Sequence, residues 1–322
     1  MTQTRRVAAI DCGTNSIRLL VADLTLGDGP TRLRDVHREM RVVRLGEGVD
    51  ATGVLSGAAI DRTWAALSDY TAILRTEGAV RVRMAATSAT RDAANRADFV
   101  DMVRSTLGQE PEVITGDEEA ELSFRGAVGD LDPSSGPFLV VDIGGGSTEM
   151  VVGSVIDGAV RIAGGLSLDI GCVRITERLL RGDPPSAGER AAATAWAKSD
   201  LAAGLDRLPI ASIRRVVPVS GTATTVAAAA LRLNSYDPDQ IHLSTIPFRR
   251  VHEVATMLLG ANRAHRAALP YMHAGRVDVI GGGALILSTL VSLVADRVKS
   301  DFERQITVSE HDILDGLALS LG

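Results

Sequence analysis

The chain has 322 residues, enough for two domains, and its hydrophobic (45%) and charged (23%) contents are those of a globular enzyme, which excludes a disordered chain. A formal net charge of −6 argues against general attraction to nucleic acids or membrane surfaces, and an aromatic content of 3% leaves few rings on which single-stranded bases could stack. A polyanionic ligand would therefore need a local basic cleft.

The cysteines and the lack of a long apolar segment indicate the cellular compartment of the protein. Cys12 and Cys172 show no CxxC spacing, which indicates a reducing compartment. No charged-then-apolar leader precedes the first predicted strand, and no apolar stretch approaches ~18 residues. We therefore expect a cytoplasmic protein that binds neither membrane nor nucleic acid.

Predicted strands and helices alternate along the chain, which favours an α/β fold. Apolar runs predict strands at 7–10 and 17–23, a third apolar stretch covers 39–45, and helical spacing predicts a helix over 57–77. The later predicted elements are a strand at 80–86, a helix at 95–107, a strand at 112–115, a helix beginning near 116, a polar turn at 130–137, a strand at 159–168, helices at 171–181 and 189–205, a strand, glycine turn and helix at 216–230, helices at 248–261 and 276–295, a strand at 303–307 and a last helix at 309–319.

One motif occurs twice, as AAIDCGTNSIRLLVAD and as LVVDIGGGSTEMVVG. In each copy an apolar strand ends in Asp, and one residue later a tight turn leads into a second alternating strand. The Asp and turn residues are Asp11, Gly13, Thr14, Asn15 and Ser16 in the first copy and Asp142, Gly144, Gly145, Gly146 and Ser147 in the second. Glycines let backbone N–H groups approach an anion, and hydroxyls add donors. One such turn could be a plain hairpin; two predict a duplicated fold that holds a phosphate from both sides.

Two common phosphate loops are excluded. A Walker loop needs a lysine, and neither Lys198 nor Lys299 lies in a glycine loop. A Rossmann turn needs a helix directly after its glycines, whereas both copies continue as strands. The paired phosphate hairpins of the actin, Hsp70 and sugar-kinase superfold remain.

Asp142 and Glu149 flank the second turn. Carboxylates beside a phosphate loop repel the ligand unless Mg²⁺ bridges them, although both could also be solvated residues at strand ends. The six histidines show no zinc-like spacing. His311-Asp312 suggests an HD phosphohydrolase, but no partner His and Asp cluster is evident, so we interpret the pair as a helix start.

Three further segments carry candidate residues. In ITGDEEAELSFRGA, Thr115 and Glu118 fit a capping box, which leaves open whether Glu119 is a base for an attacking water. Arg91 in ATSATRDAAN comes after a strand at an expected helix N-terminus, a suitable place for phosphate. Ser220, Gly221 and Thr222 offer donors after another strand, or else Gly221 serves packing; IGGGAL (280–285) is expected to serve helix packing.

Taken together, these motifs resemble the Ppx/GppA phosphatase family of exopolyphosphatases and guanosine pentaphosphate phosphohydrolases. LDIGCVRITE, RVDVIGGGALIL and ITVSEHDILDG extend the resemblance over nearly the whole chain in the family's order. It implies an actin-like fold of two domains, 1–122 with about 308–322 and 123–307, with the active site in the cleft between them. It also implies a Mg²⁺-dependent hydrolase of terminal phosphoanhydrides, for which Mn²⁺ is an alternative ion, and a homodimer.

The resemblance also assigns roles to residues. Glu119 matches the family's base, Asp142 and Glu149 its metal and water-positioning carboxylates, and Arg91 the arginine that reaches the phosphate chain. The phosphate-binding residues that it implies are Asn15, Ser16, Gly144, Gly145, Gly146, Ser147 and Thr148. Arg18 stands where family members vary, which bears on the choice between nucleotide and polyphosphate.

Two departures qualify the expected function. The family's Leu-Arg-Glu-Gly is Ile313-Leu314-Asp315-Gly316 here, which removes one basic contact. The chain also ends where long members continue into a helical domain, so we expect short polyphosphate to be favoured. We thus expect an exopolyphosphatase, with hydrolysis of pppGpp to ppGpp, a reaction of the stringent response, as the alternative. A phosphotransferase of the acetate- or sugar-kinase type and a (p)ppGpp-binding regulator are the rivals from other classes.

Overall fold

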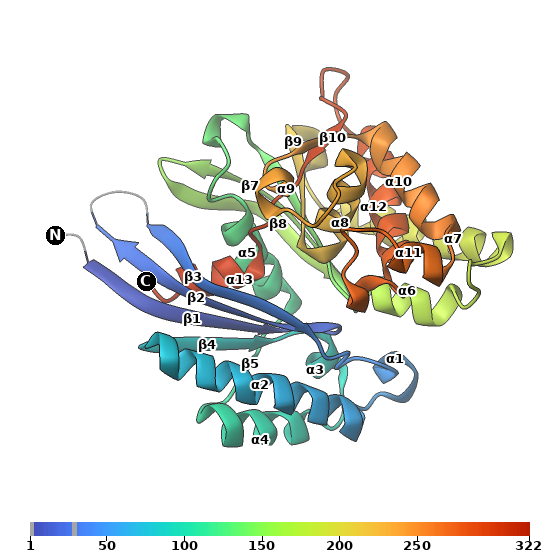
Figure 1. The fold of residues 1–322 in the computed structure, drawn as a ribbon. Helices are drawn as coiled ribbons and strands as arrows, with labels where there is room; N and C mark the ends of the chain where they lie inside the picture. Colours follow the sequence, from blue (N-terminus) through green and yellow to red (C-terminus); the bar gives the residue numbers. More distant parts are fainter. Residues whose placement is uncertain (1–2, 28–30) are drawn as a thin grey trace. The chain divides into compact units, whose positions relative to one another are not determined.

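A computed structural model describes residues 3–27 and 31–322, and the chain divides into two compact units (Figure 1). Unit 1 is Met1–Gly126 with Ile313–Gly322, and unit 2 is Ala127–Asp312. The chain therefore leaves unit 1, forms the whole of unit 2, and returns to complete unit 1 with its last helix. Among the described residues, no helix combines the length and apolar character that crossing a membrane requires.

Unit 1 is built on a five-stranded sheet in the order β3-β2-β1-β4-β5. The strands β1 (Gln3–Cys12), β2 (Ser16–Leu26) and β3 (Arg32–Val42) are antiparallel neighbours, and β4 (Arg81–Ala86) and β5 (Glu112–Val113) continue the sheet in parallel with β1. Ala8 and Ile10 pack in one apolar cluster with α2 (Gly57–Glu77) and α4 (Arg96–Leu107), whereas Val7 and Ala9 pack in another with α13 (Ile313–Leu319). Burial on both faces explains the unbroken apolar run of β1.

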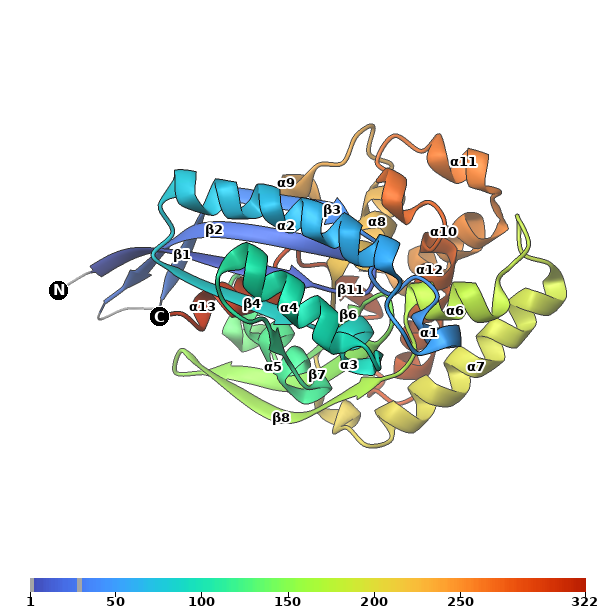
Figure 2. The ribbon, with the colours of Figure 1, turned by 90° about the horizontal axis from the view of Figure 1, so that it is seen from below.

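Unit 2 is built on a six-stranded sheet in the order β10-β11-β9-β6-β7-β8. Its strands are β6 (Phe138–Ile143), β7 (Thr148–Ile156), β8 (Ala159–Leu168), β9 (Arg215–Val219), β10 (Thr245–Pro247) and β11 (Gln305–Thr307). Its larger helices are α6 (Cys172–Leu179), α7 (Ala187–Leu205), α8 (Ser220–Leu231), α10 (Phe248–Gly260) and α12 (Ile280–Ala295) (Figure 2). The apolar α12 is buried among α6, α7, α8 and α10, so its side chains form much of the core of unit 2.

The two sheets repeat one arrangement. In each, a hairpin and a third antiparallel strand are followed by a strand that returns parallel to the first, β4 beside β1 and β9 beside β6. The registers also correspond, because Asp11 faces Arg18 in the first hairpin and Asp142 faces Glu149 in the second. The duplication predicted from the two sequence motifs is therefore present in the backbone.

Several predicted boundaries were wrong. The last helix, expected over 309–319, begins only at Ile313. The third strand covers Arg32–Val42, not 39–45, because this edge strand alternates polar and half-buried residues and lacks an apolar run. The helix expected from 276 begins at Ile280, after a 3₁₀ turn at Ala274–Arg276. The helix start expected around Arg91 is divided between the short α3 (Ser88–Asp92) and α4, so Arg91 lies in the last turn of α3.

The other short elements connect these parts. They are α1 (Val49–Thr52), α5 (Gly116–Ala127), α9 (Pro238–Ile241), α11 (Arg263–Ala267) and 3₁₀ turns at Pro133–Ser135 and Ile210–Ser212. Of these, α5 and α9 bear most directly on function, because candidate functional side chains lie in or directly after them.

Candidate functional site

The first turn is held by its neighbours in unit 1. The Gly13 N–H donates to the Ser16 carbonyl (2.9 Å), and the Asn15 carbonyl accepts from two backbone N–H groups just after β3 (3.1 and 2.9 Å). The Thr14 and Ser88 hydroxyls form a buried hydrogen bond of 2.8 Å, which ties the turn to α3. These contacts fix four predicted phosphate-side residues and place them beside the helix that carries Arg91.

Asp11 at the end of β1 is almost fully buried, with 6% of its surface exposed. Its charge is compensated across the hairpin, because Nε and Nη2 of Arg18 donate to its Oδ2 at 2.9 and 2.7 Å. A guanidinium held in this way is fixed in orientation. Arg18 thus serves the first turn itself, whatever it does for a substrate.

Two adjacent glutamates at the start of α5 have different environments. Glu119 is 8% exposed, and Nη1 of Arg91 donates to its Oε2 at 3.1 Å. The Thr115 hydroxyl accepts from the Glu118 N–H (3.2 Å), as expected for a helix cap, but the Glu118 carboxylate accepts from Arg83 (2.7 Å). Glu118 therefore forms a half-exposed ion pair with Arg83 at the surface, whereas Glu119 is a buried carboxylate oriented by Arg91.

The second turn is closed like the first, by the Gly144 N–H donating to the Ser147 carbonyl at 3.0 Å. The N-terminus of α6 then binds its carbonyl groups: the Cys172 N–H donates to Gly144 (2.9 Å), and the next two N–H groups donate to Gly145 (2.9 and 3.2 Å). Gly171 permits this approach, since a Cβ there would lie 2.4 Å from the Gly145 carbonyl oxygen. The turn is thus held by helix α6 as well as by its own strands.

Two hydroxyl residues come after the glycines of this turn, and both are buried. Ser147 is 1% exposed, and the Thr148 hydroxyl donates to the Ile170 carbonyl at 2.6 Å. The hydroxyl hydrogen of Thr148 therefore stabilises the backbone beside the turn.

Asp142 and Glu149 lie side by side on one face of the second hairpin, because they are direct cross-strand partners. They are 6% and 2% exposed, and the Ser167 hydroxyl of β8 donates to Glu149 Oε1 at 2.7 Å. Two buried carboxylates side by side form a suitable site for a cation, which would offset the repulsion between their charges. Their hard oxygen donors fit Mg²⁺, and equally Mn²⁺.

Ser220, Gly221 and Thr222 begin α8 at the carboxyl end of β9, the strand beside β6. The Ser220 hydroxyl donates to Asp312 (3.2 Å), and a Cβ on Gly221 would lie 2.4 Å from the guanidinium of Arg276. The alternative that Gly221 serves packing is thus supported.

The glycines of α12 serve close packing, as predicted for IGGGAL. A Cβ on Gly282 would lie 2.7 Å from Ile175, and one on Gly283 would lie 2.5 Å from the Thr222 hydroxyl. These small residues bring α12 against α6 and α8 and thereby support both glycine turns of unit 2.

Both cysteines lie next to a turn and are buried. Burial raises the pKa of Cys12, and the charge of Asp11 raises it further; burial raises the pKa of Cys172 to about 11. Both thiols are therefore protonated at neutral pH, which excludes them as ready nucleophiles.

The C-terminal motif belongs to unit 1. Leu314, which stands in place of the family's Arg, is buried in an apolar cluster with Leu122, and Arg38 forms an ion pair with the buried Asp315. Burial tends to lower the pKa of Arg38, but the charges and hydrogen bonds of Asp315 and Asp35 together outweigh this effect and raise it. Gly316 allows α13 to touch α5, since a Cβ there would lie 2.0 Å from the Leu122 carbonyl oxygen.

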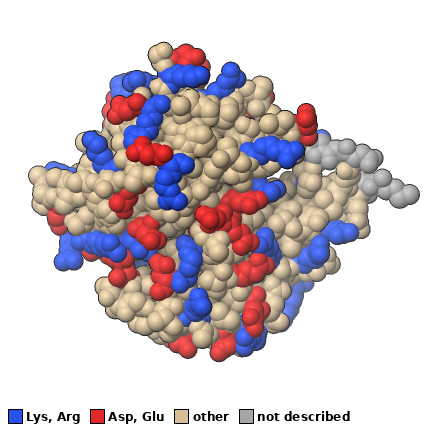
Figure 3. Space-filling model, turned by 180° about the vertical axis from the view of Figure 1, so that it is seen from behind, with Lys and Arg blue, Asp and Glu red and all other residues tan. Residues whose placement is uncertain are grey.

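Three contributors were missed from the sequence: Ser88, Ser167 and Arg276. Ser88 lies in the quoted ATSATRDAAN motif, so a signal existed. Ser167 donates a hydrogen bond to Glu149 from the neighbouring strand, and the guanidinium of Arg276 lies against Gly221. Both contacts arise only when the sheet and helices have folded, so no pattern in the sequence indicates them. On the face drawn in Figure 3, basic and acidic side chains are interspersed, so net surface charge does not mark the site there.

Comparisons with known proteins agree on one family. The profile of the Ppx/GppA phosphatase family matches residues 21–320. A protein of Mycobacterium tuberculosis named exopolyphosphatase 2 is 51% identical over 321 residues, which is 98% of each chain.

Solved structures extend this agreement to the fold. The Aquifex aeolicus member of the Ppx/GppA family matches with a TM-score of 0.79 and 28% identity, over 99% of this chain and 98% of its own. An exopolyphosphatase from Cytophaga hutchinsonii matches with a TM-score of 0.84 and 25% identity, over 97% and 96%. The predicted α/β fold of the actin-like type is confirmed.

Proposed function

Because the chain belongs to the Ppx/GppA phosphatase family, we propose that it is an exopolyphosphatase, which hydrolyses the terminal phosphoanhydride bond of inorganic polyphosphate. The observation that carries this proposal is the buried pair of carboxylates beside a glycine turn, Asp142 and Glu149, in a chain that also has a buried glutamate, Glu119, with an arginine beside it. Hydrolysis of a polyanion needs these three parts: a phosphate-binding turn, a cation site and a base.

Glu119 is the base in this proposal. It removes a proton from a water molecule, whose oxygen attacks the terminal phosphorus while the bond from that phosphorus to the bridging oxygen breaks. The shortened chain leaves with the bridging oxygen, and the terminal group is released as inorganic phosphate. Arg91 holds the carboxylate through Nη1 and has further N–H groups with which to bind a phosphate oxygen. Its nearness to the base thus gives it two tasks, orientation of Glu119 and binding of the substrate.

Asp142 and Glu149 would hold Mg²⁺, or Mn²⁺ in its place. When bound, the ion supplies positive charge that stabilises the charge developing on the phosphate oxygens. Ser167 keeps Glu149 in position through its hydroxyl. The turn residues Asn15 and Ser16 in unit 1, and Gly145 to Ser147 in unit 2, would donate to phosphate oxygens. Gly144 would support them by closing the second turn through its N–H.

The test is phosphate release with Mg²⁺ from short polyphosphate, long polyphosphate and pppGpp, without any acceptor. We expect Glu119→Gln to lower kcat by roughly 10²–10⁴-fold, the usual contribution of a general base. Glu118→Gln is the matched control, because this neighbour also pairs with an arginine but is exposed, and its rate should stay at the wild-type level. Retention of activity in Glu119→Gln would exclude the mechanism.

The same experiment separates the other functions. A preference for pppGpp would make the chain a guanosine pentaphosphate phosphohydrolase with the same residues in the same roles. A phosphotransferase would release no phosphate without an acceptor, and a (p)ppGpp-binding regulator would bind the nucleotide without turnover.

Chain length is the second variable. We propose that short polyphosphate is favoured, and a rate per chain end that keeps rising beyond about 100 phosphates would contradict this, since such chains exceed the reach of one binding surface of this size. A homodimer and a cytoplasmic location complete the proposal, and sedimentation velocity measures the first directly.

A further inference from the structure

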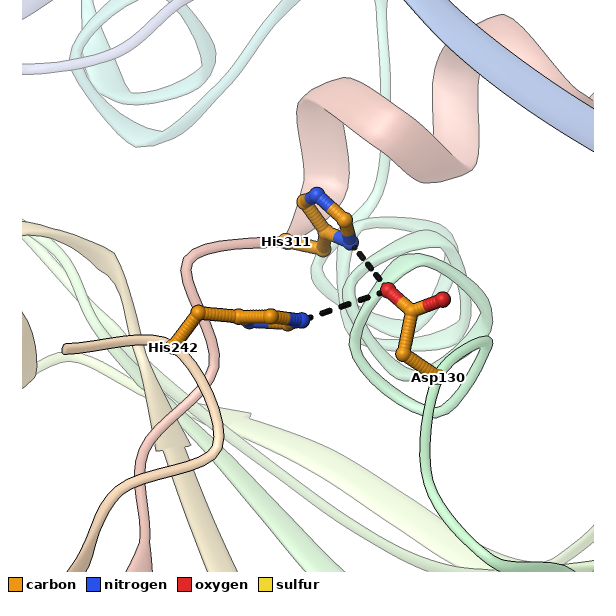
Figure 4. A group of neighbouring side chains, drawn as sticks. All are labelled: Asp130, His242 and His311. Atoms are coloured by element: carbon orange, nitrogen blue, oxygen red, sulfur yellow. Dashed lines mark ion pairs between the residues drawn. The ribbon is translucent and has the colours of Figure 1, made fainter. Parts of the chain in front are cut away.

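Three side chains that are remote in the sequence meet in unit 2 (Figure 4). Asp130 lies in the turn after α5, His242 comes directly after α9, and His311 precedes α13. Both imidazoles approach the same carboxylate oxygen: His311 Nδ1 lies 2.7 Å and His242 Nε2 lies 3.3 Å from Asp130 Oδ2. The expectation that no partner His and Asp accompany His311 was therefore wrong, although His311 does lie just before a helix, α13, as predicted.

The arrangement of these ligand atoms is close to that of a metal site. The atoms all lie within 4.8 Å of one another, and the two ring centroids are 4.6 Å apart. Around a tetrahedral zinc ion with bonds of about 2.0–2.1 Å, ligand atoms are roughly 3.3 Å apart. An ion could therefore replace the two contacts with small movements of the side chains.

We propose that Asp130, His242 and His311 bind one divalent transition-metal ion of the zinc class. Two imidazoles and one carboxylate are the donors such ions prefer, whereas Mg²⁺ prefers oxygen alone. The side chains of Asp130, His311 and His242 are 50%, 36% and 23% exposed, so an ion can enter from solvent and water can complete its coordination. The site shares no residue with the carboxylates proposed to hold Mg²⁺.

One contact opposes metal binding and has to be overcome. The Glu310 N–H donates to His242 Nδ1 at 3.2 Å, which places the proton of the neutral ring on Nε2, the atom that faces Asp130. An ion that binds Nε2 must displace this proton, and the hydrogen bond from the Glu310 N–H to Nδ1 must break. The net contribution of a single hydrogen bond is small, so its loss is a minor cost against the bonds that the three side chains would form with the ion.

The ion would join the beginning of unit 2 to its end. Asp130 is three residues after Ala127, where this unit begins, and His311 is the residue before Asp312, where it ends. His242 adds the segment between α9 and β10. Closing so long a stretch of chain restricts the unfolded state, so the bound ion should stabilise unit 2 against unfolding.

The test is calorimetric titration of the full chain with Zn²⁺ in excess Mg²⁺, together with the visible absorption of bound Co²⁺ as a report of imidazole ligands. We expect one equivalent to bind the wild type and to raise its thermal unfolding midpoint. His242→Ala, His311→Ala and Asp130→Asn should each weaken binding at least 10-fold. His265→Ala is the matched control, because this exposed histidine of α11 lies outside the cluster and should leave binding unchanged.

The variants must be folded for this test, so their unfolding in metal-free buffer is measured first. His311→Gln is a second variant that keeps a hydrogen-bonding side chain beside Asp130. Absence of Zn²⁺ binding by the wild type would overturn the proposal, as would unchanged affinity in folded His311→Ala or His311→Gln. Because the readout is metal binding, the result does not depend on which phosphate compound the protein hydrolyses.

Discussion

The two hairpin turns are closed by the same backbone hydrogen bond, but they differ in the charge of one cross-strand pair. In each, the N–H of the first glycine donates to the carbonyl of a serine three residues later, at 2.9 and 3.0 Å. In each, a buried Asp stands at the same register position, but its cross-strand partner is Arg18 in the first hairpin and Glu149 in the second. The closing hydrogen bond of the turn is therefore the same in both copies, and the cross-strand pair is one of the positions at which they differ.

The difference between these cross-strand partners determines how the charge of each buried Asp is compensated. Arg18 neutralises Asp11 within the hairpin, so the first turn needs no external cation for its own stability. Glu149 adds a second negative charge beside Asp142, so the second turn is improved by a bound cation. We infer that the first copy is a self-contained support for phosphate and that the second depends on metal.

Among substitutions in the two hairpins, replacing Glu149 by Gln should have the largest effect on catalysis. Loss of one metal ligand is expected to lower kcat by roughly 1,000-fold, which corresponds to about 4 kcal/mol. The free energy of unfolding without metal should stay the same or rise slightly, because one of two like charges is removed and Gln can still accept from Ser167. Phosphate release and urea unfolding measure the two effects, with Glu118→Gln as control. A normal rate in Glu149→Gln would remove the proposed contrast between the turns.

Replacing Arg18 by Gln should mainly lower the free energy of unfolding. It leaves Asp11 buried without its guanidinium, and because the side chain of Arg18 is 19% exposed we expect a loss of about 3 kcal/mol, the lower end for a broken buried pair. The double variant Asp11→Asn with Arg18→Gln should recover most of this loss, since no uncompensated charge remains. Urea unfolding of the single and double variants provides the test. A single variant as stable as the wild type would mean that Arg18 does not compensate Asp11.

The sequence predicts the parts of this fold that leave a pattern in neighbouring residues. The two motifs give both hairpins, and apolar periodicity gives α2, α4 and the core strands, because burial on fixed faces leaves a pattern along the chain. The edge strand β3 has no such pattern, so its start was misplaced. Family resemblance, and not spacing, singled out Glu119 among three consecutive acidic residues.

Contacts between distant segments were beyond prediction. Arg91 and Glu119 are 28 residues apart, and their hydrogen bond exists only because α3 and α5 both come after strands of one sheet. His242 and His311 are farther apart still and belong to no recognised spacing. Glycines are an intermediate case: the sequence shows Gly171 within LDIGCV, but only the structure shows which carbonyl it approaches.

A pair of glycine substitutions tests whether the two turns are held differently. A Cβ on Gly171 would lie 2.4 Å from the Gly145 carbonyl oxygen, and backbone atoms of a turn cannot move aside as a flexible side chain can. Gly171→Ala should therefore cost about 2 kcal/mol of stability by overpacking, and it should lower kcat about 10-fold or more by displacing the second turn. A Cβ on Gly13 would find its nearest neighbour at 3.6 Å, so Gly13→Ala should change stability by no more than about 0.5 kcal/mol. Equal losses in the two variants would show that α6 does not hold the second turn in the way its contacts indicate.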